Sequence, residues 1–479
     1  MDFRSIFQFI PEVKSPEEKK LSFNVKLKWT LIVLVSFFIL ANVPLFGLSN
    51  NALEKFKYLA IILGTDFGSI ISLGIGPIVM ASVILQLLTG SGIINIDTTT
   101  AEGRKFFQGL QRILTFFFII FEAMIYVLMQ GLQAAPGFTS LLIFQLVLGG
   151  LAIFYMDDLM SKWGFGSGIS LFIGAGVSWQ LITSAFQFMT QQGQNCLLDF
   201  NNTACPGKVF VVIQSIINKY PTELISALGA IIVTIIIFMA VTWTQSLKVE
   251  VPLSYGKLRG YAVKWPLAFF YSSNIPVILT AALIVSLQVF GGIVENAAAP
   301  CLISSSACVG VAKFASYFGF LGHFINGQPV SGLSFWMGSS NLLELIIRGG
   351  LLPKYILQGL THTLIYVVLS TVFAVFWVKT SGMDAKSQAH KITASGLQIA
   401  GFRQDERVLE SILERYVMPL TVMGGIAIGL LASVTNLMGA LVSGTAILLV
   451  IMIFFQFYQN IVQQHQTDMN PAFRKFMKT

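Results

Sequence analysis

Residues 72–82 read SLGIGPIVMAS, and they break what would otherwise be a continuous apolar stretch. Gly74, Gly76 and Pro77 stand where a membrane-spanning helix would be expected to run without a break. Proline removes a backbone donor and clashes with the preceding helical turn. Such a break is tolerated inside a membrane only where protein or a water-filled cavity receives the freed backbone groups. The stretch therefore predicts a cavity within the membrane region of the chain.

The composition identifies the class of protein. Of the 479 residues, 55% are hydrophobic and only 11% are charged. Ordinary soluble domains carry about 25% charged residues, so a soluble protein of this composition could not cover its surface with polar groups. Residues 1–27 are polar and charged and lack the short apolar core of a removable signal peptide. We therefore expect a polytopic membrane protein whose first span acts as its own anchor.

Ten apolar runs approach the length of about 20 residues that a spanning helix needs. The even number puts both termini on one side of the membrane, and the expected fold is an all-α polytopic membrane protein with ten transmembrane helices. The predicted spans are 29–48, 75–90, 108–131, 139–156, 168–188, 221–243, 267–290, 355–378, 416–436 and 443–460.

Lysine and arginine indicate which side holds the termini. If the N-terminus is cytoplasmic, 23 of the 30 Lys and Arg residues fall in the tails or in cytoplasmic connections. This is the bias of the positive-inside rule. The segment 1–28 and the tail 461–479 are then both cytoplasmic. The net charge of +8 is accounted for by topology, so no DNA partner is expected.

The ten spans divide into two halves of five, residues 29–190 and 221–460, joined by an outer loop at 191–220. The second span of each half contains a proline after small or polar residues, in LGIGPIV and in SSNIPVIL. An odd number of spans per half makes the halves inverted, and broken helices at matching positions point to a central site.

Three further segments lie outside the spans. The cytoplasmic loops 244–266 and 379–415 are long and basic, and they are either positive-inside charge or a docking surface for an acidic partner such as ribosomal RNA. The stretch FRSIFQFIPEV has apolar residues on one helical face, which suits an interfacial helix. The outer loop 291–354 is rich in glycine and serine and predicts no particular structure.

All four cysteines fall on the predicted outer side, where disulfides persist. Cys196 and Cys205 lie in one loop, and Cys301 and Cys308 lie in another. Local pairs are the simplest of three possible connectivities, and unpaired thiols are the alternative.

The sequence offers no sign of an enzyme or a cofactor. It has no Walker A motif, no nucleophile motif and no zinc-ligand spacing among its four histidines. Glu122 is the clearest ionisable residue inside a span, and such a residue usually faces a cavity or a partner. One acidic residue is little for an ion-coupled transporter.

Several long motifs, in order, resemble the SecY family in its archaeal branch and the alpha subunit of the eukaryotic Sec translocon. The similarity runs from about residue 8 to residue 472. The motifs are IPEV, LGIGPIVMASVILQLLTGSGII, SKWGFGSGISLFI, VEVPL, YSSNIPVILTAAL, SGMDAKS, GFRQDERVLE and GALVSGTAILL.

The resemblance implies a protein-conducting channel with an hourglass pore between the two halves. By motif position, the pore ring would consist of Ile75, Val79, Ile169, Ile173, Ile278 and Leu449. The first two pairs are spaced i, i+4, which puts each pair on one helix face. Core packing gives the same spacing.

The resemblance also implies a plug and a lateral gate. The half-helix near 53–67 would be a re-entrant plug. The plug and hinge residues would be Leu53, Phe56, Leu59, Leu63, Gly64, Gly68, Gly74, Gly76 and Pro77. Gln86, Glu122 and Asn274 match lateral-gate positions between spans two and three and spans seven and eight. Met80 replaces a threonine common in relatives.

Partners and location follow from the same resemblance. Lys257, Arg259 and Arg403 match docking loops for a ribosome or motor. The family associates with small SecE-type and beta or SecG-type membrane subunits and acts on polypeptides that carry signal sequences. The expected location is the plasma membrane, or the endoplasmic reticulum membrane in a eukaryote.

Two other functions fit part of the sequence. A secondary solute transporter with inverted repeats would also have broken helices, but the two basic loops and the lack of substrate-binding charges count against it. An assembly or insertase subunit without its own pore would not need an apolar ring.

Overall fold

The computed structural model describes most of the chain. The described residues are 12–17, 21–51, 53, 65, 67–90, 93–94, 96, 100–190, 195–196, 204–255, 262–272, 274–303, 316–325, 327–394, 397–399 and 406–468. The predicted interfacial helix and most of the predicted plug, including Phe56, Leu59, Leu63 and Gly64, lie outside these ranges.

Ten helices of the described residues overlap the predicted spans in sequence. Among the described residues, nine helices are long and apolar enough to cross a membrane, and the tenth, α4, has 15 residues. The ten are α2 (Phe23–Ala41), α4 (Gly76–Gly90), α5 (Ala101–Leu128), α6 (Thr139–Trp163), α7 (Gly168–Phe186), α9 (Pro221–Ser246), α10 (Ile275–Ile303), α14 (Pro353–Thr380), α16 (Glu406–Leu437) and α17 (Gly444–Asp468).

The predicted bounds of the first span, 29–48, and of the seventh, 267–290, are wrong at both ends, and those of the seventh differ more from the helix. The first residues of the seventh span belong to strand β4 (Ala262–Ala268) and to the turn that follows, and helix α10 begins only at Ile275. The helix then continues to Ile303, through residues assigned to the outer loop 291–354. Apolar content alone cannot separate a buried strand and turn from the start of a helix.

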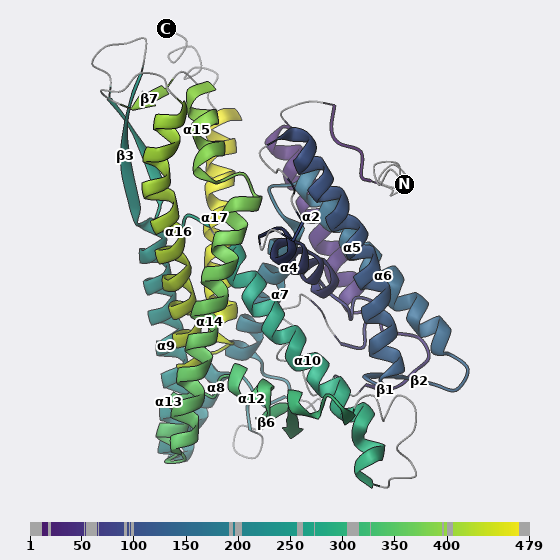
Figure 1. Ribbon diagram of the computed structural model, residues 1–479. Helices are drawn as coiled ribbons and strands as arrows, with labels where there is room; N and C mark the ends of the chain where they lie inside the picture. The colour runs from purple at the N-terminus through teal and green to yellow at the C-terminus, as the bar shows by residue number, and fades with distance from the viewer. Residues whose placement is uncertain are drawn as a thin grey trace.

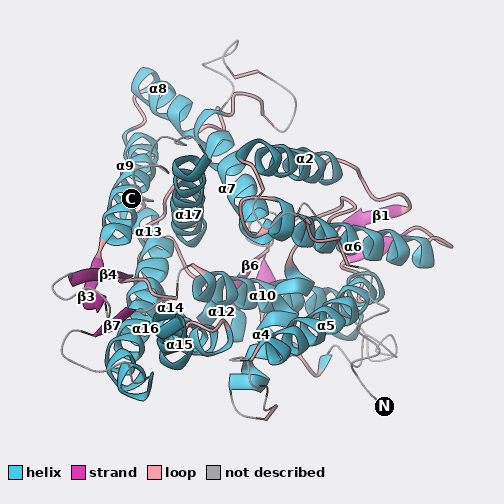
Figure 2. Cartoon of the chain, turned by 90° about the horizontal axis from the view of Figure 1, so that it is seen from above, coloured by secondary structure: helices cyan, strands magenta, loops and turns pink. Residues whose placement is uncertain are grey.

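The helices form two groups of five (Figure 1). Helices α2 and α4 to α7 make one side of the molecule, and α9, α14, α16 and α17 with α10 make the other. Seen from above, α4, α7, α10 and α17 surround the centre (Figure 2). We call the end that carries β3, β4 and β7 the hairpin end, and the end that carries α8, α12, β5 and β6 the loop end.

The break predicted from Gly74, Gly76 and Pro77 corresponds to a non-helical segment, residues 67–75, just before α4. Gly68 and Gly74 have φ of +101° and +56°, a region that favours glycine. The amide of Leu45 donates to the carbonyl of Gly68 at 2.9 Å, and the amide of Ile70 donates to that of Val43 at 3.0 Å. Residues of the segment after α2 therefore form hydrogen bonds with backbone groups that the break leaves outside a helix.

Helix α4 starts where the sequence predicts. Gly76 is its first residue and Pro77 lies in its first turn, where a missing amide hydrogen costs nothing. Helix α6 packs closely against the preceding segment, because a Cβ on Gly149 would clash with the carbonyl oxygen of Ile70.

The basic loop 244–266 contains most of a β-hairpin. Strand β3 (Lys248–Tyr255) pairs antiparallel with β4, and β7 (Leu397–Ile399), from the second basic loop, pairs with the other edge of β3. Alternation of charged and apolar residues in KVEV is the period-2 signal that could have predicted this strand. The second loop also contains α15 (Ala385–Ala394) and the first turns of α16.

Shorter elements complete the loop end. Strands β1 (Leu48–Asn51) and β2 (Leu132–Ala134) form one small sheet, and β5 (His323–Ile325) and β6 (Gln328–Ser331) form another. The helices there are α8 (Lys208–Asn218), η3 (Gly319–Leu321), α12 (Leu333–Met337) and α13 (Leu342–Ile347).

Residues 12–14 tie the N-terminal segment to the hairpin end of α5 and α6. Glu12 forms ion pairs with Arg112 at 2.9 Å and with Lys162 at 2.5 Å. The amide of Val13 donates to Asp158 at 3.0 Å. The two cations lower the pKa of Glu12 to about 2 by hydrogen bonding to its carboxylate.

Candidate functional site

The six predicted ring residues belong to one hydrophobic cluster between the two groups of helices. Ile169 is partly exposed and the other five are buried. They come from α7, α10, α17 and α4 with the residue just before it. The six are Ile75, Val79, Ile169, Ile173, Ile278 and Leu449. We call this set the apolar layer.

A cavity of about 230 Å³ borders the apolar layer on its hairpin-end side. Val79, Ile169 and Ile278 of the layer line it. The rest of the lining comes from six helices and their termini, and its polar residues are Ser82, Gln86, Gln111, Ser167, Ser170, Asn274, Gln456 and Asn460.

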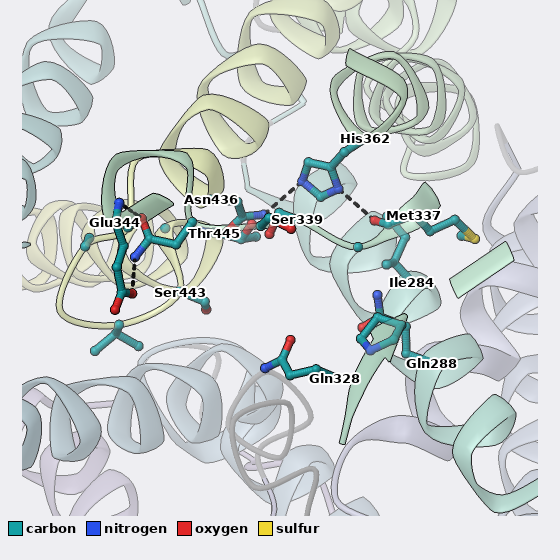
Figure 3. A pocket seen from close by; sticks show the side chains of 18 of the residues that line it. Ile284, Gln288, Gln328, Met337, Ser339, Glu344, His362, Asn436, Ser443 and Thr445 are labelled. Carbon is teal, nitrogen blue, oxygen red and sulfur yellow. Dashed lines mark hydrogen bonds between the residues drawn. The ribbon is translucent and has the colours of Figure 1, made fainter. Parts of the chain in front are cut away.

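A second cavity, of about 720 Å³, lies towards the loop end (Figure 3). His362 lines it, its Nδ1 donates to the carbonyl of Met337, 2.7 Å away, and its Nε2 lies 3.4 Å from the side-chain nitrogen of Asn436. Gln288, Gln328 and Thr445 also face this space. The cavity is therefore rich in hydrogen-bonding groups.

Residues of the apolar layer lie between the two cavities along two helices, α7 and α17. On α7, Ser170 lines the first cavity and Gln180 the second, with Ile173 between them. On α17, Gln456 lines the first cavity and Thr445 the second, with Leu449 between them. At about 1.5 Å per residue, these pairs are about 15 Å apart along their helices. The two cavities therefore lie on opposite sides of Ile173 and Leu449.

The structure brings together two of the three predicted gate residues. Gln86 of α4 and Asn274, just before α10, are buried and line the hairpin-end cavity. The Oε1 atom of Gln86 has no hydrogen-bond partner among the described residues. Glu122 does not line this cavity, and its carboxylate lies instead beside Gly76 at the start of α4, 3.1 Å from where a Cβ would stand.

Helix α4 closes the space between the two groups of helices. It contacts both α10 and α14. Near its end, Gly90 lies so close to the ring of Phe376 on α14 that a Cβ on the glycine would clash with it. The helices predicted to bound a lateral opening are thus in contact with each other.

The remaining predicted residues fall into three groups. Leu53, Gly68 and Pro77 are described, with Leu53 fully buried. The docking residues Lys257, Arg259 and Arg403 lie outside the described residues. Cys196 and Cys205 form a disulfide, with Cα atoms 5.3 Å apart. The side chain of Cys301 and all of Cys308 are not described.

Sequence reasoning missed several lining residues. Gln111 of α5 donates to the hydroxyl of Ser82 at 2.6 Å, and Asn460 of α17 donates to the carbonyl of Phe165 at 3.1 Å. A polar residue in an otherwise apolar span was the available signal for each.

In the described part of the chain, no group of His, Cys, Asp or Glu could hold a metal ion.

Comparison with known proteins supplies independent information. The profile of the SecY family matches residues 69–458. The chain is 37% identical to the protein translocase subunit SecY of Methanothermobacter thermautotrophicus, covering 99% of this chain and 98% of that one. It is 34% identical to the corresponding subunit of Methanocaldococcus jannaschii, over 98% of both chains.

Two solved structures are similar throughout. One, described as a protein conducting channel, has a TM-score of 0.79 and 32% identity, and the match covers 98% of this chain and 99% of that one. The other is Sec61 in a canine ribosome-channel complex from the endoplasmic reticulum, with a TM-score of 0.76, 32% identity and the same coverage.

Proposed function

Because the chain belongs to the SecY family of protein translocase subunits, we propose that the two cavities and the apolar layer form the path of a translocating polypeptide. The observation that carries this proposal is the apolar layer between two cavities that both contain hydrogen-bonding side chains. An apolar constriction excludes water and ions when no chain is present. Branched side chains make few directional contacts, so polypeptides of many sequences could pass.

The contact of α4 with α10 and α14 suits a lateral gate. Gln86 and Asn274 place polar groups beside the hairpin-end cavity, next to this contact. A hydrophobic signal or membrane segment in that cavity would leave sideways, because its transfer to lipid is favourable. Glu122 would act at the base of α4, against Gly76, rather than with the other two.

The plug and the partners extend the proposal. Residues 53–67 would fill the loop-end cavity between translocation events, with Gly68 and Gly74 as the hinge. Lys257, Arg259 and Arg403 would meet a ribosome, as the ribosome-bound Sec61 structure suggests for that relative. SecE-type and beta or SecG-type subunits would complete the complex.

We place the hairpin end and both termini in the cytoplasm, in agreement with the Lys and Arg bias and with the disulfide at the opposite end. The archaeal relatives favour the plasma membrane. The relatives are named for translocation and conduction, so the chain would move polypeptides without catalysing a covalent reaction. They give no support to the solute-transporter hypothesis.

A photocrosslink tests the path directly. A photoreactive amino acid is placed at Ile278, and the reconstituted protein is given a ribosome stalled on a secretory chain. The matched control is the same residue at Ile235, which is exposed on α9. We expect crosslinks to the nascent chain at Ile278 and few at Ile235.

The result that would overturn the proposal is an absence of crosslinks at Ile278 while the ribosome is bound and the protein is inserted. Equal yields at Ile278 and Ile235 would also count against it, because the chain would then lack a defined path.

A further inference from the structure

Helix α8 presents an apolar stripe to the outside of the molecule and buries Ser215. Ile213, Ile216, Ile217 and Tyr220 are 46%, 61%, 57% and 61% exposed, and they follow the i, i+3, i+4, i+7 spacing of one helical stripe. Ser215 is buried in the middle of the helix. A helix on a water-facing surface has the opposite pattern, so water is not the natural medium for this apolar stripe.

The protein holds α8 in place at its first turn. The disulfide between Cys196 and Cys205 closes the chain just before the helix. The amide of Cys205 donates to Oε1 of Gln214 at 3.2 Å, and the amide of Gly207 donates to the carbonyl of Gln187 at 2.9 Å. The side chain of Gln214 thus holds α8 against its own preceding loop, and the backbone of Gly207 joins that loop to the end of α7, while the apolar stripe stays outward.

The apolar stripe continues the surface that faces lipid. Helix α8 packs on α9 and α7 and lies at the edge of the molecule (Figure 2). Exposed apolar residues occur on the loop-end turns of both neighbours, with Ile182 and Phe186 on α7 and Ile225 and Leu228 on α9. Because α7 and α9 are long and apolar enough to span a membrane, these side chains lie at membrane depth, and the stripe lies next to them.

The ends of α8 suit the boundary between acyl chains and headgroups. Lys208 is the first residue of the helix and Lys219 follows its last. A lysine can lay its stem along apolar surface while its ammonium group reaches phosphate and water. Tyr220 combines an apolar ring with a polar hydroxyl, the property that enriches tyrosine at membrane interfaces.

We propose that α8 is an interfacial anchor that lies in the leaflet at the loop end, with Ile213, Ile216 and Ile217 among the acyl chains and Lys208 and Lys219 at the headgroups. The occupant of the apolar stripe is lipid, rather than a second copy of the chain or another membrane protein. This anchor goes beyond the channel function and requires only that the chain spans a membrane.

The test uses the full chain in vesicles of phosphatidylcholine and phosphatidylglycerol. A photoreactive amino acid is placed at Ile216, and lipid adducts are counted by mass spectrometry after illumination. The same residue at Ile232, exposed on α9, gives the yield at a lipid-facing position. The same residue at Arg348, which lines the loop-end cavity, gives the yield at a polar position at the same end.

We expect the adduct yield at Ile216 to match that at Ile232 and to exceed that at Arg348 several-fold. A yield at the level of Arg348, with a normal yield at Ile232, would overturn the anchor. Crosslinks from Ile216 to a second copy or to another protein, in place of lipid, would overturn it as well. The Ile278 experiment does not depend on either result.

Discussion

At the scale of single residues, several polar side chains of the membrane region have partners on helices far apart in the sequence. Gln86 and Asn274 meet at one cavity, whereas Glu122 turns to the start of α4. Spacing within one helix fixes a face, while the partner of that face depends on packing between helices distant in sequence. The same holds for Glu12, whose partners lie 100 and 150 residues away.

Acid should release the N-terminal segment through Glu12. Because the folded-state pKa of this carboxyl is about 2, below its usual value of 4.5, its contribution to stability is present above about pH 4.5 and is lost as the pH falls towards 2. Hydrogen exchange at Val13, corrected for intrinsic rates, should show falling protection over this range.

The control for this prediction is Glu12→Gln, which removes the charge at every pH. Its protection at Val13 should be lower at neutral pH and should change less with acid. If the variant followed the same pH dependence as the original protein, another carboxyl group would be responsible.

At the scale of elements, the helices were predictable because each carries about 20 apolar residues, and the short strands were not. The hairpin of β3 and β4 was hidden in a loop identified only by its charge. Conversely, the Gly and Pro residues at 74–77 gave the start of α4 to within a residue. These residues could not predict the course of segment 67–75, because its backbone hydrogen bonds are made with residues 43 and 45.

Gly149→Ala tests how tightly that segment is held. An added Cβ would clash with the carbonyl oxygen of Ile70, which is backbone and cannot rotate away. Overpacking of this kind costs about 1–3 kcal/mol, and we expect a lower midpoint of thermal unfolding in detergent.

Gly174→Ala is the matched control, since it is also inside a helix of the first half and its Cβ would meet Ile453 at an ordinary 3.4 Å. It should leave the unfolding midpoint nearly unchanged. Equal effects of the two substitutions would mean that the 67–75 segment moves aside readily.

At the scale of the whole molecule, the charge bias and the count of apolar runs indicated the topology, and the resemblance supplied the hourglass. The cavities themselves were beyond the sequence, because each is lined from several helices of both halves. The breaks at Pro77 and Pro276 and the acidic Glu122 only indicated that a central cavity exists.

The topology makes a prediction of its own. An epitope tag at either terminus should be reached by protease only from the cytoplasmic side, because ten crossings return the chain to the side where it began. A tag inserted at Pro206, exposed ahead of α8, should be cleaved only from the other side. Termini on opposite sides would mean an odd number of crossings.

The sheet at the hairpin end has a consequence for how such a chain can diverge. Strand β3 pairs with β7 through Leu253 and Ile399, so two loops that appear independent share one set of backbone hydrogen bonds. An insertion that shifts one strand by a single residue turns its side chains to the opposite face. The lengths of the two loops are therefore coupled. A change of length in one loop preserves the sheet only outside the paired residues, or together with a compensating change in the other loop.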